Sequence, residues 1–309
     1  MARHILFLGP VLLFGCLQPP DVGSTNTGDS TAATTTTSDT TAESTGSSSD
    51  GPPGETTDTS TSAGPSTTTG ATTSTASTGG GLCGDGELDP GEECDNGLAG
   101  NADDAACLID CKLASCGDGL VRKVVEECDD QNNNPADGCH TCYRTRRVFI
   151  TSAVYQGAQF MGIEGADQRC RSLAAQAGLM NAPKFKAWLS DSQTAAKERL
   201  YHARGRYELI NGLLVADNWD ALVAGNLINP INVTEKSETF NTGVFTSTTP
   251  DGSIAAGADH CADWTAQELA NKAFWGASSE ISADWTIADS PVNPQECGSH
   301  RALYCFEQE

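Results

Sequence analysis

The second half of the chain alternates apolar and polar residues with the periods of strands and helices. A strand is predicted over 148–152, where Val, Phe and Ile precede Thr and Ser. A helix is predicted over 166–177, because small and apolar side chains recur at helical spacing at Ala166, Cys170, Leu173, Ala174 and Ala177. Gly178 is placed to end this helix, and Cys170 is expected to face the core.

A strand, a short helix and a hairpin are predicted downstream of this helix. Phe, Ala and Leu alternate with Lys and Trp over 184–189, which indicates a half-buried strand. Ser190 or Ser192 is expected to cap a short helix that follows. A hairpin is predicted over 207–215, because the central Asn211-Gly212 pair accepts the left-handed angles of a type I′ turn.

The rest of the chain, after residue 215, also alternates between helix and strand patterns. Asn218 is expected to cap a helix over 219–223. Further strands are predicted over 244–248 and 302–306, with a turn at Asp251-Gly252 between them. Short strands and helices therefore share one domain over 146–309, and the fold class predicted for it is α+β.

Residues 81–145 carry the same cysteine pattern twice. Each copy opens with Cys-Gly-Asp-Gly, has Glu-Glu-Cys-Asp at its centre and closes with a near pair of cysteines. Units this small bury little apolar surface, so we expect disulfides to stabilise them. Four cysteines allow three pairings in each copy, and the sequence does not choose among them. The eight are Cys83, Cys94, Cys107 and Cys111 in the first copy and Cys116, Cys128, Cys139 and Cys142 in the second.

These motifs resemble the cysteine-rich repeat of many myxobacterial surface proteins. Seven aspartates in the repeats offer carboxylate oxygens, which hard cations such as calcium prefer. Their spacing does not fit the Asp-x-Asp-x-Asp-Gly calcium loop, so solvated carboxylates are the competing interpretation. Calcium is the one cofactor that the sequence leaves open, and the residues concerned are Asp85, Asp89, Asp95, Asp118, Asp129, Asp130 and Asp137.

Residues 16–80 are expected to form a disordered linker. Between 24 and 80 the chain is almost entirely Thr, Ser, Gly, Ala, Pro and Asp, with no lysine or arginine. No hydrophobic period offsets the entropy of ordering this segment, so a flexible tether, open to O-linked sugars, is predicted. The whole chain has a formal net charge of -23, which argues against nucleic acid as a partner.

Residues 1–15 resemble a bacterial lipoprotein signal peptide. Arg3 precedes an apolar run that is too short to cross a bilayer, because a spanning helix needs roughly 20 apolar residues. Leu13-Phe14-Gly15-Cys16 then resembles a lipobox, in which the cysteine carries a diacylglyceryl group. Cys16 is also the cysteine left over when the others form even sets. An ordinary secretory signal that leaves Cys16 free is the alternative.

The lipobox resemblance implies that the lipid is the membrane partner of this chain. Leu17 follows the anchor, which in the bacterial sorting rule permits transfer to the outer membrane. An exported protein of the outer membrane or cell surface is therefore expected. Cysteine pairs persist in such oxidising compartments, which agrees with the high cysteine content of the chain.

A series of motifs runs in order along 146–309. It consists of Gly162-Ile-Glu-Gly-Ala-Asp-Gln-Arg-Cys170, Phe185-Lys-Ala-Trp-Leu-Ser190, Trp219-Asp-Ala-Leu222, Cys261-Ala-Asp-Trp264, and Cys297 with seven residues before Cys305. These motifs resemble endostatin, the C-terminal domain of certain collagens, and related domains of bacterial lipoproteins. The resemblance extends over the whole domain.

The resemblance implies a C-type-lectin-like fold with two nested disulfides, Cys170–Cys305 and Cys261–Cys297. Local roles follow for the residues of the motifs. Gly165 is expected to let the chain turn into the helix, and Asp167 to accept backbone hydrogen bonds near the helix start. Core positions are expected for Trp188, Trp219 and Trp264.

Endostatin also binds heparin through surface arginines, and basic residues are concentrated over 184–206 here. Candidates for binding a polyanion are Lys184, Lys186, Lys197, Arg199, Arg204 and Arg206. Glu198 and Glu208 interrupt this series, so simple solvated cations are the alternative. The zinc site of endostatin does not carry over, because the arm 142–147 has no histidine. The calcium motifs of lectins, Glu-Pro-Asn or Gln-Pro-Asp with Trp-Asn-Asp, are absent as well.

No catalytic motif is present in the sequence. Gly-x-Ser-x-Gly, His-Glu-x-x-His, a phosphate loop and a dinucleotide fingerprint do not occur. In Asp259-His260-Cys261, a bridged Cys261 cannot act as a nucleophile, and His260 is expected at the surface. We therefore expect a non-enzymatic binding or adhesion module for a glycan, matrix or protein partner. A structural envelope component without a specific ligand is the alternative, and a hydrolytic enzyme is less favoured.

Replacing Cys16 with Ser is expected to release the protein from the membrane fraction, because the thiol carries the lipid that anchors it. Cell fractionation and detergent phase partition measure this release. Ser24→Ala, a change in the linker, is the matched control and leaves the protein in the membrane. Membrane recovery of the Cys16→Ser variant equal to that of the unaltered chain would contradict the anchor.

Overall fold

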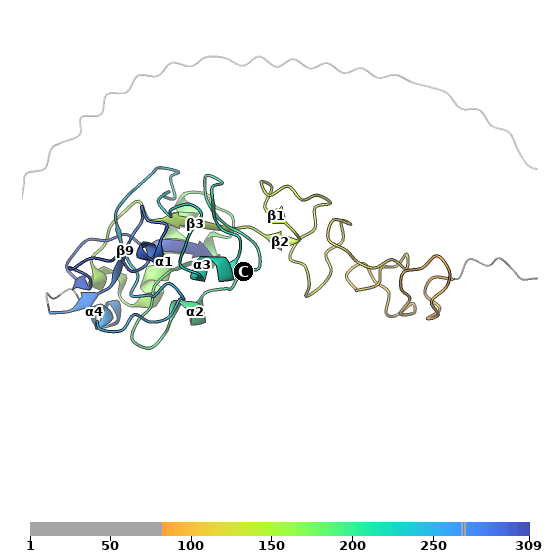
Figure 1. Cartoon of the computed structure of the whole chain (residues 1–309), viewed down its shortest axis with the longest axis horizontal. Coiled ribbons are helices and arrows are strands. Elements are labelled where there is room, and N and C mark those ends of the chain that lie inside the picture. Colours follow the sequence, from red (N-terminus) through yellow and green to blue (C-terminus); the bar gives the residue numbers. More distant parts are fainter. Residues whose placement is uncertain (1–81, 267, 269) are drawn as a thin grey trace, which may run out of the picture. The chain divides into compact units, whose positions relative to one another are not determined.

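A computed structural model describes residues 82–266, 268 and 270–309 of the chain (Figure 1). The predicted lipid anchor at Cys16 and the linker over 16–80 lie outside the described residues. Regular secondary structure is sparse before Arg146 and frequent after it. Among the described residues, no helix has the length and apolar character needed to span a bilayer.

Both repeats consist mainly of turns that disulfides hold together. The first cysteine of each copy pairs with the fourth, and the second pairs with the third. The bonds are Cys83–Cys111, Cys94–Cys107, Cys116–Cys142 and Cys128–Cys139. Strands β1 (Cys139–His140) and β2 (Tyr143–Arg144) pair antiparallel at the end of the second copy. An isolated bridge between Cys107 and Leu113 occupies the corresponding place in the first.

A five-stranded mixed sheet forms the centre of the C-terminal domain. Its strand order is β4 (Phe185–Ala187), β11 (Tyr304–Glu307), β3 (Arg146–Ile150), β5 (Tyr207–Leu209) and β6 (Leu214–Ala216). Strand β11 is antiparallel to both of its neighbours, whereas β3 and β5 are parallel. The earliest and the latest strand of the domain therefore lie side by side in the middle of the sheet.

Short helices and strand pairs surround this sheet. The helices are η1 (Gly157–Phe160), α1 (Ile163–Gln176), η2 (Ala182–Lys184), α2 (Ala196–Arg199), α3 (Trp219–Val223), α4 (His260–Trp264) and η3 (Ala283–Trp285). The additional antiparallel pairs are β7 (Gly243–Phe245) with β9 (Trp275–Ala277) and β8 (Lys272–Ala273) with β10 (Gln295–Glu296). The predicted α+β class is thus confirmed.

Apolar side chains cover both faces of the sheet. In β3, Val148 and Ile150 belong to one hydrophobic core and Phe149 to the other. A strand that is buried on both faces reads as a continuous apolar run, because successive side chains point to opposite faces. Trp188 is fully buried in the first core, which confirms the core position expected from the motifs. It alternates with buried Ala187 and Leu189 of the second core, so this segment is covered on both faces and is not half-buried, as its pattern had indicated.

Glycines at both ends of α1 allow the chain to change direction. Gly162 precedes the helix with a φ of 93°, and Gly178 follows it with a φ of 69°. Contrary to our expectation, Gly165 does not make the turn into the helix but lies inside it. A Cβ at Gly165 would lie 1.7 Å from the carbonyl oxygen of Phe160, so this position needs glycine because the backbone approaches closely.

The predicted hairpin forms from β5 and β6, but with a different turn. The N–H of Gly212 donates to the carbonyl of Leu209 at 2.9 Å, so Ile210 and Asn211 are the central residues. Gly212 has a φ of 88°, whereas Asn211 is not among the residues with positive φ. Leu209 also donates to the carbonyl of Leu213 at 2.8 Å. This is a three-residue loop with a left-handed glycine rather than a type I′ turn.

The two capping predictions have different outcomes. Asn218 caps α3, and its side chain accepts a hydrogen bond from the N–H of Ala221 at 2.9 Å. Helix α2 begins at Ala196, so neither Ser190 nor Ser192 is its N-cap residue. The hydroxyl of Ser190 still accepts a hydrogen bond from the N–H of Ala196 at 2.9 Å. Ser190 lies outside the helix, yet its hydroxyl satisfies one of the backbone N–H groups of the first helical turn.

Two disulfides cross-link the domain. Cys170 of α1 is bonded to Cys305 of β11, and Cys261 of α4 is bonded to Cys297. These are the same pairs that the resemblance to endostatin implies. The bond between Cys170 and Cys305 spans a sequence separation of 135 residues. A loop of this size corresponds to about 4–5 kcal/mol of stabilisation in the chain-entropy model.

A buried ion pair connects α1 with α2. Asp167 Oδ2 pairs with Arg199 Nη2, and these side chains are 3% and 9% exposed. Asp167 Oδ1 also accepts a hydrogen bond from the N–H of Ala187 in β4 at 2.9 Å. The prediction that Asp167 bonds the backbone near the helix start is therefore wrong, because the carboxylate instead joins three separate elements.

Asp167→Asn is expected to lower the free energy of unfolding by about 3–5 kcal/mol, because it leaves the guanidinium of Arg199 buried without a counter-ion. Urea denaturation measures this change. Glu164→Gln is the matched control, since it removes the partner of Arg171 at a side chain that is 79% exposed. The control is expected to cost less than about 1 kcal/mol. Equal losses in the two variants would contradict the proposed role of the pair.

Candidate functional site

The polyanion-binding candidates do not form one continuous free surface. Two lysines donate to oxygens of the domain itself, Lys186 to the carbonyl of Arg199 at 2.9 Å and Lys197 to the hydroxyl of Ser253 at 2.7 Å. Arg206 lies within 4 Å of two carboxylates. The prediction for Arg199 is wrong, because this side chain is buried against Asp167. Four of the six candidates therefore serve internal contacts.

Lys184 and Arg204 remain exposed, and neither has a carboxylate within 4 Å among the described residues. Lys184 borders a cavity of about 380 Å³, and Arg204 borders another of about 430 Å³. Both cavities include Tyr201 in their walls. We call this region the basic groove and define it by its exposed or half-exposed cations, Arg144, Arg171, Lys184, Lys186 and Arg204.

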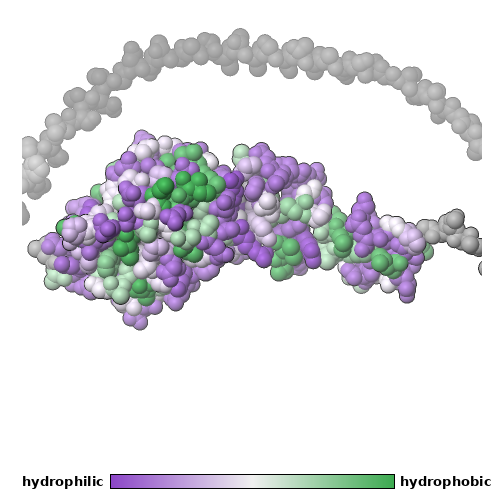
Figure 2. Space-filling model, viewed as in Figure 1, coloured by the Kyte–Doolittle hydropathy of each residue, from purple (hydrophilic) through white to green (hydrophobic). Residues whose placement is uncertain are grey.

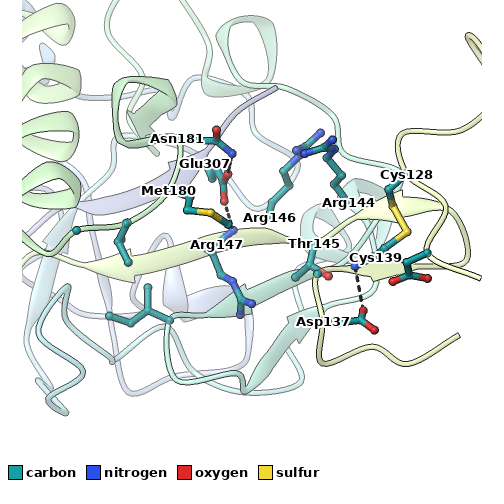
Figure 3. A pocket seen from close by; sticks show the side chains of 15 residues that line it. Cys128, Asp137, Cys139, Arg144, Thr145, Arg146, Arg147, Met180, Asn181 and Glu307 are labelled. Atoms are coloured by element: carbon teal, nitrogen blue, oxygen red, sulfur yellow. Dashed lines mark hydrogen bonds between the residues drawn. A yellow bond between two sulfur atoms is a disulfide. The ribbon is translucent and has the colours of Figure 1, made fainter. Parts of the chain in front are cut away.

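A third cavity, of about 570 Å³, lies where the second repeat meets β3 (Figure 3). The side chains of Arg144 and Arg146 point to one side of the strand and Arg147 points to the other (Figure 3). Glu307 accepts hydrogen bonds from the N–H of Arg147 at 2.9 Å and from the amide of Asn181 at 2.7 Å. The lining residues include no histidine and no free thiol. The cavity is suited to polar contacts and lacks a nucleophile of the Cys–His type.

His260 is buried, with 4% of its surface exposed, so our expectation of a surface position is wrong. It opens α4, a left-handed turn whose five residues have φ values between 47° and 65°. Burial lowers the pKa of His260, and the neighbouring Asp263, Asp191 and Asp259 raise it by a smaller amount. Cys261 beside it is disulfide-bonded. A buried imidazole without a free thiol or activated hydroxyl does not make a nucleophilic site.

Carboxylates of the repeat motif bind the backbone of the same repeat. Asp95 Oδ2 accepts a hydrogen bond from the N–H of Gly84 at 2.8 Å, and Asp129 Oδ2 accepts one from Gly117 at 2.7 Å. Desolvation raises the pKa of Asp95, but its hydrogen bonds, three of them from backbone N–H groups, outweigh this and lower it. The pKa of Asp129 is lowered in the same way. Each aspartate thus joins the Glu-Glu-Cys-Asp centre to the Cys-Gly-Asp-Gly loop.

The described residues offer two groups of possible metal ligands, and both contain disulfide sulfur. They are Cys83, Glu92 and Cys111 in the first repeat and Glu126, Asp129 and Cys142 in the second. The thiolate is the form of cysteine that binds a metal, and these sulfurs are oxidised. The carboxylates that remain already accept backbone hydrogen bonds. The geometry therefore gives no support to a calcium site in the repeats.

Glu127 connects the second repeat to the C-terminal domain. Its Oε2 atom accepts a hydrogen bond from Arg146 Nη2 at 2.7 Å, and its Oε1 atom accepts one from the hydroxyl of Tyr201 at 2.8 Å. Burial raises the pKa of Tyr201, and the hydrogen bond to Glu127 raises it further. Nearby, the guanidinium of Arg204 lies 5.3 Å from the ring centroid of Tyr143. Sequence reasoning missed this junction, because Glu127 and Tyr201 are far apart in the chain.

Two likenesses to known proteins cover parts of this chain. A family described as "Domain of unknown function (DUF4215)" matches residues 104–143, from the end of the first repeat through most of the second. Over 64 residues, 20% of this chain, the sequence is 42% identical to the acetylcholinesterase collagenic tail peptide of Torpedo marmorata. That match spans 12% of the length of the Torpedo protein. The findings support a cysteine-rich repeat region in this chain.

Asp95→Asn is expected to loosen the first repeat, because the amide turns a donor toward N–H groups that need an acceptor. The rate at which a phosphine reductant opens Cys83–Cys111, followed by alkylation and mass spectrometry, should rise. Because the pKa of Asp95 is lowered, its stabilising effect is complete above the ordinary value of 3.8 and is lost as the pH falls below it. The variant should therefore differ most near neutral pH.

Asp103→Asn is the matched control for this experiment, since its carboxylate is exposed and makes no hydrogen bond among the described residues. A reduction rate in Asp95→Asn that equals the rate in the control at pH 7 would contradict the role assigned to Asp95.

Proposed function

We propose that this chain is an exported lipoprotein of the outer membrane or cell surface, which displays a binding module on a disordered tether. The lipobox-like Leu13-Phe14-Gly15-Cys16 and the Thr/Ser-rich segment that follows support this proposal. Six disulfides in the described residues also agree with an oxidising compartment.

We further infer that the C-terminal domain is endostatin-like, with a C-type-lectin-like fold. The two disulfides join the pairs that the sequence motifs imply. The earliest and latest strands lie adjacent in the sheet, and the tryptophans of the motifs, Trp188, Trp219 and Trp264, are buried. These features support the resemblance over the domain as a whole rather than over one motif.

We infer a binding or adhesion function, directed to an anionic group on a glycan, matrix or protein partner. One observation carries this inference: Lys184 and Arg204, two exposed cations of the basic groove, have no carboxylate within 4 Å among the described residues, although the chain has a net charge of -23. A cation that acidic neighbours do not neutralise is available to a ligand. A catalytic function has no such support, because the candidate His260 is buried beside a disulfide.

A structural envelope component without a specific ligand is the second candidate. The internal contacts of Lys186, Lys197, Arg199 and Arg206 favour it, since these cations stabilise the domain itself. A glycan array and a pull-down with the unaltered chain distinguish the two candidates. No specific binding in either assay would favour the structural role.

Lys184→Ala is expected to weaken binding to a sulfated polysaccharide about fivefold, because an exposed ion pair contributes up to about 1 kcal/mol. Surface plasmon resonance at two salt concentrations measures the loss, which should shrink in high salt. Lys272→Ala is the matched control, as Lys272 is exposed on β8 outside the basic groove. Equal binding by both variants would remove the basic groove as the ligand site.

A further inference from the structure

The two repeats have corresponding surfaces at their C-terminal ends. Glu93 donates its N–H to the carbonyl of Cys111 at 2.9 Å, just as Glu127 donates to Cys142 at 2.9 Å. Glu93 Oε2 accepts from the N–H of Leu113 at 3.1 Å, and Glu127 Oε2 accepts from Arg144 at 3.3 Å. These bonds establish which positions correspond. Glu93, Lys112, Leu113 and Ser115 in the first repeat match Glu127, Tyr143, Arg144 and Arg146 in the second.

The C-terminal domain covers this surface in the second repeat. The hydroxyl of Tyr201 donates to Glu127 Oε1 at 2.8 Å, and Arg204 lies over the ring of Tyr143. Gly205 packs so closely that a Cβ there would lie 2.5 Å from the carbonyl oxygen of Arg144. A polypeptide segment with a tyrosine, an arginine and a glycine thus forms this contact.

The corresponding surface of the first repeat borders an open cavity of about 530 Å³, which we call the repeat groove. Its apolar residues are Leu108, Ile109, Leu113 and Leu120, and its acidic residues are Glu93, Asp103, Asp110 and Asp118. Ile109 is 65% exposed and Leu113 is 54% exposed. On the face drawn in Figure 2, hydrophobic residues stand out among hydrophilic ones on the repeats.

In the second repeat a glutamate oxygen accepts a hydrogen bond from the C-terminal domain, and the matching oxygen of the first repeat has no such donor. Glu93 Oε1 has no hydrogen-bond partner among the described residues, whereas Glu127 Oε1 accepts from Tyr201. Lys112 is the single cation that lines the groove, against four carboxylates. The groove therefore combines apolar contact area with an exposed negative rim, which suits a side chain that has an apolar body and a donor or cationic tip.

We propose that the repeat groove binds a basic polypeptide segment of another protein, with a tyrosine and an arginine at nearby positions. The tyrosine would repeat the contact of Tyr201 with Glu127 at the matching Glu93. The arginine would complement the carboxylates of the groove, because Lys112 stands where the second repeat has Tyr143. A second copy of this chain is disfavoured as the occupant, because its Tyr201 and Arg204 are already in contact with its own second repeat. Two chains of net charge -23 also repel each other.

Selection of phage-displayed random heptapeptides on the immobilised full chain tests this proposal. Peptides that combine arginine with tyrosine are expected to be enriched, and synthetic copies should bind in fluorescence anisotropy. Ile109→Ser combined with Asp110→Asn is expected to weaken their binding about tenfold, since both side chains are exposed in the groove. Glu87→Gln is the matched control, an exposed acid of the same repeat outside the groove.

Failure to enrich such peptides, or enriched peptides that bind the double variant as tightly as the unaltered chain, would overturn the proposal. Self-association of the chain in sedimentation that the double variant abolishes would also overturn it, because the occupant would then be a second copy. The double variant leaves the basic groove intact, so binding to a sulfated polysaccharide should be unchanged. This readout separates the present inference from the function proposed above.

Discussion

The pairing of β3 with β11 in the middle of the sheet is the contact on which the C-terminal domain depends. Both hydrophobic cores draw on these two strands, because the alternating side chains of each strand enter opposite cores. The Cys170–Cys305 bond fastens α1 to the same strand, and Arg147 of β3 binds Glu307 of β11 through its backbone N–H. The helices and loops that line the cavities are therefore arranged around this central pair.

The repeats are stabilised differently, because they have no hydrophobic core comparable in size to those of the C-terminal domain. Each copy relies on two disulfides and on carboxylates that accept backbone N–H groups, as Asp95 and Asp129 do. This use of the acidic residues accounts for the Glu-Glu-Cys-Asp motif in structural terms. Apolar side chains such as Ile109 remain exposed on the first repeat. In the second repeat, the C-terminal domain covers the corresponding surface through the contact of Tyr201 with Glu127.

Local signals in the sequence predicted the elements that depend on neighbouring residues. The helix with Cys170 on its inner face, the Asn218 cap and the place of the β5–β6 hairpin are confirmed, since each follows from spacing within a few residues. Contacts between distant residues were not predictable in this way. The Asp167–Arg199 pair spans 32 residues and the Glu127–Tyr201 bond spans 74, so neither leaves a periodic pattern. The burial of His260 likewise depends on packing from separate segments.

The central place of β11 also has a consequence for the order in which the domain matures. A chain that is synthesised from its N-terminus releases β3 long before β11, and the N–H of Leu303 meets the hydroxyl of Thr151 across 152 residues. Until β11 is released, its place between β3 and β4 in the sheet stays empty. The sheet therefore forms late, because it depends on contacts between residues that are far apart in the sequence. The sheet of the C-terminal domain is therefore completed only when β11 becomes available.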